Sequence, residues 1–467
     1  MTALDLCTAS WARQQFGACD LGDQRRSKRL VNMAEHMANN PSASFPDQME
    51  TWGDLKAAYC LFDSQSVTFE MISQPHWQSV RACGAGRYLI LGDTTEIDFG
   101  IRRAIEGLAP TGNGRGYGFL VHSGLMVDAD SERIIGLSAQ TIHYRQPVAK
   151  NETASQRMSR DRASQVWGKV IDQTGPAPDG AEFVHVLDRG ADNFEVFCHL
   201  QDQRVHWVVR ASQLHRNIIT PSGEKTALNK YINALPVAGT YALKLRARPR
   251  QPARTAKLEV RYGRLSMSEP VLKSAYVKQR DGGPMTMSVV DVREVDAPPG
   301  VTPIAWVLYT SRTINNFEEA RTIIGYYEKR WLIEEYHKAL KTGCRVEARQ
   351  LKSPQRLETM LGLMAVVAVR LLQLKSVART QPQRPAQEVV PPLWIAMLIA
   401  VSKQPRRREL TVNQFYRELA KLGGFIGRKS DGQPGWITIW RGWEKLNLMI
   451  RGHNRLNERQ PQRQNCG

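Results

Sequence analysis

The sequence predicts an α/β protein that carries an antiparallel β insertion and has a helical region at each end. Three observations support this fold class. Apolar residues recur at helical spacing near both ends, two short apolar runs (88–93 and 183–188) end in aspartate, and the segments between about 203 and 311 alternate or run apolar. At 467 residues the chain is too long for one ordinary core, so we expect two or three domains.

The charge balance favours a polyanionic partner. The chain has 64 Lys and Arg against 45 Asp and Glu, which gives a net charge of +19. A value this high favours DNA or RNA over an anionic membrane.

The seven scattered cysteines form no C-x-x-C motif and no Cys/His pair at zinc spacing, which predicts a reducing compartment and no thiolate metal site. Without an export signal or an uninterrupted apolar span, we expect a soluble cytoplasmic protein with no membrane partner.

The first 65 residues are expected to form a small helical domain. Helices are predicted over 11–16, 23–34 and 52–62, with a loop at 41–46. The second helix begins with a basic cluster of Arg25, Arg26, Lys28 and Arg29. This cluster could grip DNA phosphates, and a solvated charged face is the alternative.

The two apolar runs each predict a buried strand that ends in a carboxylate, Asp93 or Asp188. Further strands are expected at 118–128 and 134–140, and a helix with a polar face at 153–173. In open α/β sheets the ligand site lies beyond the carboxyl ends of the strands, where both aspartates are expected. An aspartate in that position can also be a simple turn residue.

Residues from about 203 to 311 are predicted to form the β insertion, with strands beginning near 207, 241, 257, 287 and 304. In the second of these, Lys244, Arg246 and Arg248 share one face, and five more cations follow by residue 264. Such a face could follow a phosphate backbone or could simply be solvated.

One stretch, 326–343, combines an apolar face with a polar stripe. A helix is predicted to begin at an Asn316 cap, with Glu319 three residues on, and to end at Gly343. The stripe comprises Tyr327, Arg330, Glu334 and Lys341, and the opposite core face comprises Leu332, Tyr336, Ala339 and Leu340. Taken alone, the stripe also fits a solvated face, and a break near Trp331 would turn Tyr327 away from it.

The C-terminal part is again helical in pattern. A helix at 357–374 precedes a Gln/Pro-rich linker at 380–392, and helices follow over 393–450. Trp440 and Trp443 could lie at an interface, although core packing is the more common fate of tryptophan. The polar tail 451–467 is expected to fray.

These parts favour metal-dependent phosphoryl transfer on nucleic acid. No phosphate-binding loop and no nucleophile elbow occurs, so neither a nucleotide cofactor nor covalent Ser or Cys catalysis is expected. Asp93, Asp188 and Glu334 are carboxylates in a strongly basic chain. Mg²⁺ prefers a few carboxylates together with phosphate oxygens, and two such ions can clamp both sides of a phosphodiester.

The spacing Tyr327-x2-Arg330-x3-Glu334-x6-Lys341 resembles the signature of the DDE cut-and-paste transposases of the insertion-sequence-four family, in particular its transposon-five-type members. Asp93-Thr-Thr and Asp188-Arg-x-Ala-Asp192 extend this likeness, as do segments near both ends of the chain. The resemblance implies an RNase H-like catalytic core at 66–375, with the β insertion at about 203–311. It also implies a helical DNA-binding domain at 1–65 and a helical dimerisation domain at 393–467.

The resemblance further implies site residues. Asp93, Asp188 and Glu334 would hold two Mg²⁺ ions, with Mn²⁺ able to substitute. Trp306 would stack on a flipped base. The DNA contacts would be Tyr327, Arg330, Lys338, Lys341, Arg189, Arg210, Arg25, Arg26 and Arg29. The family has a basic patch after Arg210 where this chain has Ala211-Ser-Gln-Leu, so the match is weaker there.

The implied reaction is cutting at inverted-repeat transposon ends through a hairpin, followed by strand transfer into target DNA. A homodimer in a synaptic complex would act on the nucleoid, each subunit cutting the end bound by the other. Two alternatives remain at this point. One is an RNase H-like nuclease without strand transfer, and the other is a non-catalytic DNA-binding inhibitor of transposition.

Overall fold

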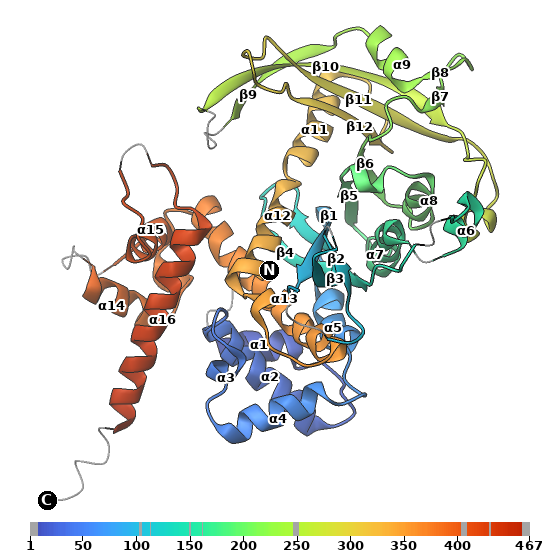
Figure 1. Cartoon of the computed structure of the whole chain (residues 1–467). Helices are drawn as coiled ribbons and strands as arrows, with labels where there is room; N and C mark the ends of the chain where they lie inside the picture. The colour runs from blue at the N-terminus through green and yellow to red at the C-terminus, as the bar shows by residue number, and fades with distance from the viewer. Residues whose placement is uncertain are drawn as a thin grey trace, which may run out of the picture.

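The computed structural model describes residues 8–101, 105–112, 114–148, 151–160, 162–245, 252–402, 409–428 and 431–459. The N-terminal helices, the sheet and the C-terminal helices follow one another along the chain, occupy different parts of the molecule (Figure 1) and pack against one another through a shared buried cluster. The described cysteines (Cys19, Cys60, Cys83, Cys198 and Cys344) are all free thiols.

The N-terminal region is a group of five helices. They are α1 (Thr8–Phe16), α2 (Gln24–Asn39), α3 (Phe45–Gln48), α4 (Trp52–Phe62) and α5 (Phe69–Arg81). Side-chain oxygens accept from free backbone N–H groups at the starts of α2 to α5, as from Arg25 N to Asp23 at 2.7 Å. The predicted apolar face of α2 is confirmed, because Leu30, Met33, Ala34 and Met37 are buried.

The central sheet contains both antiparallel and parallel strand pairs. It contains β1 (Gly86–Asp98), β3 (Gly116–Asp128), β4 (Ile134–His143), β5 (Ala181–Leu187) and β6 (His206–Arg210) in the order β4-β3-β1-β5-β6, with the short β2 (Ala109–Thr111) also paired to β3. The first three pair antiparallel, and β1-β5 and β5-β6 pair parallel. The predicted α/β class is thereby confirmed.

Alternate residues of the strands face two different layers, as the pleat requires. Leu89 and Leu91 of β1 join one buried cluster with the N-terminal and C-terminal helices, whereas Ile90 joins the other cluster, with α7 (Val166–Thr174) and α8 (Phe194–Asp202). The helix expected over 153–173 is wrong as one element. It is divided into α6 (Ala154–Ser159), the 3₁₀ turn η1 (Ala163–Gln165) and α7.

The insertion extends the same sheet. It comprises β7 (Asn217–Ile219), β8 (Lys225–Ala227), β9 (Gly239–Leu245), β10 (Arg254–Met267), β11 (Met285–Val295) and β12 (Ala305–Thr310), with the helices α9 (Leu228–Ala234) and α10 (Ala275–Lys278). Its strands pair antiparallel as expected, and β12 joins it to β6. The segment starting near 207 differs from that expectation, because it forms β6, a strand that runs parallel to β5.

The basic face predicted in the insertion is partly neutralised. Lys244 is exposed, but Arg246, Arg248 and Arg250 lie outside the described residues. Arg254 pairs with Glu294, and Arg261 pairs with Glu259 at 2.8 Å, so these two cations are taken up within the sheet.

The helix predicted from Asn316 to Gly343 is interrupted. The Asn316 cap is confirmed, with Glu319 N donating to its side chain at 2.9 Å. The chain then forms α11 (Phe317–Glu328), breaks at Lys329 and Arg330, resumes as α12 (Trp331–Lys338) and ends in the π-helical turn η3 (Ala339–Gly343). The predicted core face is confirmed, because Leu332, Tyr336, Ala339 and Leu340 are buried.

The rest of the chain comprises the 3₁₀ turn η4 (Val346–Ala348), α13 (Pro354–Thr380), the 3₁₀ turn η5 (Ala386–Glu388), α14 (Pro392–Val401), α15 (Val412–Leu422) and α16 (Trp436–Arg459). By length and composition α13 could cross a membrane, but 89% of its most apolar window is buried inside the protein, as in the core helix of a soluble protein. Figure 1 shows α14, α15 and α16 gathered together beyond α13.

One expectation for this region needs correction and one is confirmed. In the Gln/Pro-rich linker, Ala386, Val389 and Val390 are buried. The expected fraying from 451 is wrong as far as Arg459, where α16 ends, and 460–467 lie outside the described residues. Trp440 and Trp443 are buried, which confirms core packing.

Candidate active site

Asp93 and Asp188 lie on neighbouring parallel strands. The β1-β5 register pairs Leu91 with Val186, so two residues further on Asp93 lies level with Asp188. Alternation along each strand places both on the face that packs against the N-terminal and C-terminal helices, because Leu91 and Val186 belong to that cluster. The predicted meeting of the two aspartates at one edge follows from this register.

Asp93 does not end its strand, contrary to expectation. Strand β5 stops at Leu187, but β1 continues to Asp98 because β3 pairs with it over that length. Asp93 therefore lies inside a strand whose parallel partner has just ended. Its Oδ1 accepts from Thr94 N at 2.9 Å, and Asp188 Oδ1 accepts from Gly190 N at 2.7 Å.

Arg330 connects the third carboxylate to this pair. Its Nη2 donates to Glu334 Oε1 at 2.8 Å, and its Nη1 lies 3.5 Å from Asp93 Oδ2. Arg330 is the residue that caps the start of α12 and lies one turn before Glu334. The structure thus brings Asp93, Asp188, Arg330 and Glu334 into one electrostatic cluster.

The pKa of Asp93 is raised to about 6, chiefly by burial and also by the nearby charges of Asp188 and Glu334, against the opposing effects of Arg330 and the Thr94 N–H. His337 Nδ1 lies 3.9 Å from Asp93 Oδ2. Burial lowers the pKa of His337 to about 3, so this imidazole is neutral near pH 7 and adds no positive charge. The cluster therefore holds more negative charge than its one arginine balances.

This donor set suits a hard divalent cation, which prefers carboxylate oxygens. Among the described residues, no three His, Cys, Asp or Glu side chains are grouped as metal ligands. Glu334 instead directs one oxygen to Arg330, and half of its side chain (51%) remains exposed. A cation bound by both Asp93 and Glu334 would require the Glu334 side chain to change rotamer and leave Arg330.

Tyr327, Arg210 and Trp306 meet beside this cluster. Because of the helix break, Tyr327 is buried rather than part of an exposed stripe. Its ring contacts Trp306 edge to face at 5.6 Å, and its hydroxyl lies 3.5 Å from Arg210 Nη1. The guanidinium groups of Arg210 and Arg330 each lie 6.0 Å from the Tyr327 ring centre.

The remaining cations expected near the site have different surroundings. Arg189 follows Asp188 and is exposed. Lys338 pairs with Glu335 at 3.3 Å, and Lys341 pairs with Glu347 at 3.0 Å. A phosphate would have to compete with these carboxylates for the two lysines.

The N-terminal cations lie on α2, in the helical region separate from the carboxylates (Figure 1). Arg25 is exposed. Arg26 donates to the Leu21 carbonyl at 3.1 Å, and Arg29 pairs with Asp54 at 2.7 Å. The cluster is thus less open than the sequence indicates, because two of its arginines also hold their own domain together.

His337 lies near the carboxylates, and no sequence pattern predicted a role for it. The available signal was its spacing, because positions three apart on a helix share a face, and His337 follows Glu334 by three. Nothing in the sequence alone indicated that this face would turn toward Asp93.

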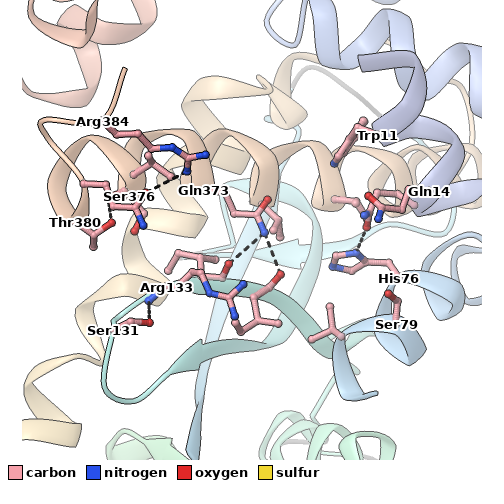
Figure 2. Close-up of a pocket in the computed structure, with 18 residues that line it drawn as sticks. Trp11, Gln14, His76, Ser79, Ser131, Arg133, Gln373, Ser376, Thr380 and Arg384 are labelled. Atoms are coloured by element: carbon pink, nitrogen blue, oxygen red, sulfur yellow. Dashed lines mark hydrogen bonds between the residues drawn. The ribbon is translucent and has the colours of Figure 1, made fainter. Parts of the chain in front are cut away.

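A cavity of about 640 Å³ lies elsewhere, between α1, α5, β4 and α13. Figure 2 shows Gln373 reaching the β4 edge, where its Nε2 donates to the Ile134 and Ile135 carbonyls at 3.2 and 3.0 Å. No Asp or Glu is among the described residues that line it, so it lacks the ligands that a hard cation needs. The Gln373 contacts protect an edge strand instead.

Three family models match the chain. They are "Transposase DNA-binding" at residues 8–67, "Transposase DDE domain" at 160–370 and "Transposase Tn5 dimerisation domain" at 366–459. A solved structure, "Cryo-EM structure of piggyBac transposase synaptic complex with hairpin DNA (SNHP)", matches at 9% identity over 81% of this chain and 72% of that chain. Its TM-score of 0.36 is too low to add to the argument. The chain therefore belongs to the DDE transposases of the insertion-sequence-four, Tn5 type, which are DNA-binding, dimerising enzymes that cleave DNA and transfer strands with divalent cations.

Proposed function

We propose that Asp93, Asp188 and Glu334 are the metal-binding catalytic triad of this transposase. The observation that carries the proposal is the register of β1 and β5, which sets the two aspartates level on the face toward α12, where Arg330 links Asp93 to Glu334. The raised pKa of Asp93 fits a site that lacks positive charge. The proposed domains are 1–65 for DNA binding, 66–375 for catalysis and 393–467 for dimerisation.

Two Mg²⁺ ions, for which Mn²⁺ can substitute, would supply Lewis-acid activation of the attacking and leaving oxygens. The chain's own residues prepare the site for this. The strand pairing fixes Asp93 and Asp188, while α12 presents Glu334. Arg330 holds Glu334 in the free protein, and it becomes available to a DNA phosphate once that carboxylate turns to a cation.

We propose that DNA is bound at two places, beside the carboxylates and on α2. Tyr327, Arg330, Lys338, Lys341, Arg189 and Arg210 hold phosphates of the transposon end, and Arg25, Arg26 and Arg29 bind the end from the N-terminal domain. Trp306 stacks on a flipped base, a use that suits an indole face because every base has a π face. Its half-buried position against Tyr327 keeps it beside the phosphate-binding side chains.

The reaction proposed is excision through a hairpin followed by strand transfer into target DNA. A homodimer in a synaptic complex holds two inverted-repeat ends on the bacterial nucleoid in the cytoplasm, and each subunit cuts the end that its partner binds. The steps are successive in-line displacements at phosphorus, so one set of carboxylates can serve all of them.

Substitution of single carboxylates tests the triad. Asp188→Asn and Glu334→Gln are expected to retain end binding and to abolish Mg²⁺-dependent nicking, because each removes one anionic ligand. Glu388→Gln is the control, since Glu388 is an exposed carboxylate paired with Arg384 outside the sheet. Nicking that persists in either variant would remove that residue from the triad.

The same assay separates the alternatives. Released, unjoined cut ends would indicate a nuclease without strand transfer. End binding by the parent protein without any nicking would indicate an inhibitor.

A further inference from the structure

Glu335 follows the proposed metal ligand Glu334 but faces a different part of the protein. It is 8% exposed, and its carboxylate accepts hydrogen bonds from Trp436 Nε1 and Lys375 Nζ. Lys338 Nζ adds a third contact at 3.3 Å. Two of these partners come from other elements, because Lys375 lies on α13 and Trp436 begins α16.

Lys375 and Trp436 also contact each other. The Lys375 ammonium lies 3.8 Å from the Trp436 ring centre, a cation–π distance at which a partly desolvated pair is favourable. Glu335 thus joins a closed group of three side chains, in which an anion, a cation and an indole each contact the other two.

We call α12 together with the following turn η3 (331–343) the catalytic helix. A second contact lies at its C-terminal end. Trp436 stacks on Trp440, with ring centres 4.9 Å apart and an interplanar angle of 15°. Trp440 in turn packs against Gly343, the last residue of the π-helical turn that carries Lys341. A Cβ at Gly343 would lie 2.5 Å from Trp440 Cζ2, so only glycine permits this approach.

The start of α16 therefore contacts the catalytic helix at both Glu335 and Gly343, on either side of Lys341. Adjacent helical residues point about 100° apart, so a fixed Glu335 carboxylate also fixes the direction in which Glu334 leaves the helix. A rotation of α12 that breaks the Trp436 contact would move Glu334 relative to Asp93.

We propose that Trp436, Lys375 and Glu335 are positioning residues that make cleavage depend on the docking of the dimerisation helices against the catalytic helix. The proposal rests on the proposed function, because it takes Glu334 as a metal ligand. The group acts on the rate of the chemical step through the orientation of Glu334. It acts neither on end binding nor on dimerisation, because its three side chains are engaged with one another inside a single subunit.

Trp436→Phe is the most selective test. It keeps an aromatic ring that can pack against Trp440 and Lys375, and it removes the N–H that Glu335 accepts together with part of the indole volume. The matched control is Trp443→Phe, on the same helix, because Trp443 Nε1 has no hydrogen-bond partner among the described residues. Glu335→Gln and Glu335→Leu form a graded pair, since Gln retains an oxygen acceptor and Leu retains none.

The measurements are end-DNA affinity, dimer formation, melting temperature, the single-turnover nicking rate and the Mg²⁺ concentration that gives half the maximal rate. Trp436→Phe is expected to bind ends and dimerise like the parent, to nick about tenfold more slowly and to need more Mg²⁺, because small misplacements of catalytic groups cost rate. Glu335→Gln is expected to nick faster than Glu335→Leu, and Trp443→Phe to nick like the parent.

A purely structural role predicts a different pattern. The melting temperature would fall, and the nicking rate and Mg²⁺ requirement of the folded protein would not change, which would overturn the proposal. Failure of the triad assignment is recognised separately. If Glu334→Gln nicks normally while Glu335→Gln does not, the catalytic carboxylate is Glu335 and both proposals are wrong. If Glu334→Gln is inactive and Trp436→Phe nicks normally, only the positioning role fails.

Discussion

Asp93→Asn is expected to make the metal-free protein more stable at neutral pH. The pKa of Asp93 is raised from its ordinary value of 3.8 to about 6, chiefly by burial and also by the neighbouring carboxylates Asp188 and Glu334. The folded protein therefore binds this proton more tightly than the unfolded chain does. The stability that this provides is full below pH 3.8 and is lost as the pH rises through 6.

The size of the effect follows from the shift. A change of about two pKa units corresponds to about 3 kcal/mol between the two protonation states, and at pH 7.5 the parent has lost all of it. Asparagine stays neutral and avoids this loss. For a catalytic region of this size, the gain amounts to a rise in melting temperature of roughly 5 °C.

Thermal unfolding without divalent cations, at pH 7.5 and at pH 4, provides the assay. The variant is expected to melt higher than the parent at pH 7.5, and the difference is expected to shrink at pH 4, where Asp93 is largely protonated. Mg²⁺ serves as the internal control, because it should raise the melting temperature of the parent and not that of the variant. A variant that melts lower than the parent at pH 7.5 would show that the site does not store unbalanced negative charge.

The remaining predictions concern two residues. Trp306→Ala is expected to slow hairpin formation more than the first nick, measured by resolving the two products on a denaturing gel; equal loss of both would indicate a core role instead. Arg349→Met is expected to loosen the N-terminal helices from the core at a cost of about 3 kcal/mol, because buried Arg349 donates to the carbonyls of Ala43, Pro41 and Cys344 at 2.6 to 2.8 Å. Its effect is read from limited proteolysis near residue 42, and an unchanged cleavage rate would contradict it.

Local pattern was enough to predict most of the elements that build the site. The apolar runs before Asp93 and Asp188 gave two buried strands, and the caps gave the start of α11 at Asn316. These predictions succeed because strand and helix periodicity and capping depend on residues close in sequence.

Other features of the site depend on contacts between segments that are distant in the sequence. The extension of β1 past Asp93 depends on β3. The sequence left a break near Trp331 open as an alternative to an exposed stripe, and the structure has this break, with Tyr327 buried beside Trp306. The role of Glu335 was hidden for the same reason, because its partner Trp436 lies about a hundred residues away.

The sheet is continuous from β5 through β6 to β12, and this pairing fixes distances across it. Val209 pairs with Leu187, and Leu308 pairs with Arg210, so Asp188, Arg210 and Leu308 lie in one row across three strands. Two strand spacings amount to about 10 Å, which sets the span from the proposed metal site to the strand that carries Trp306. A hydrogen-bonded sheet cannot hinge between neighbouring strands without breaking its ladder, so this span is the same before and after DNA binds. If Trp306 stacks on a flipped base while the scissile phosphate lies at the metal site beside Asp188, as proposed, the DNA must supply the distortion between them.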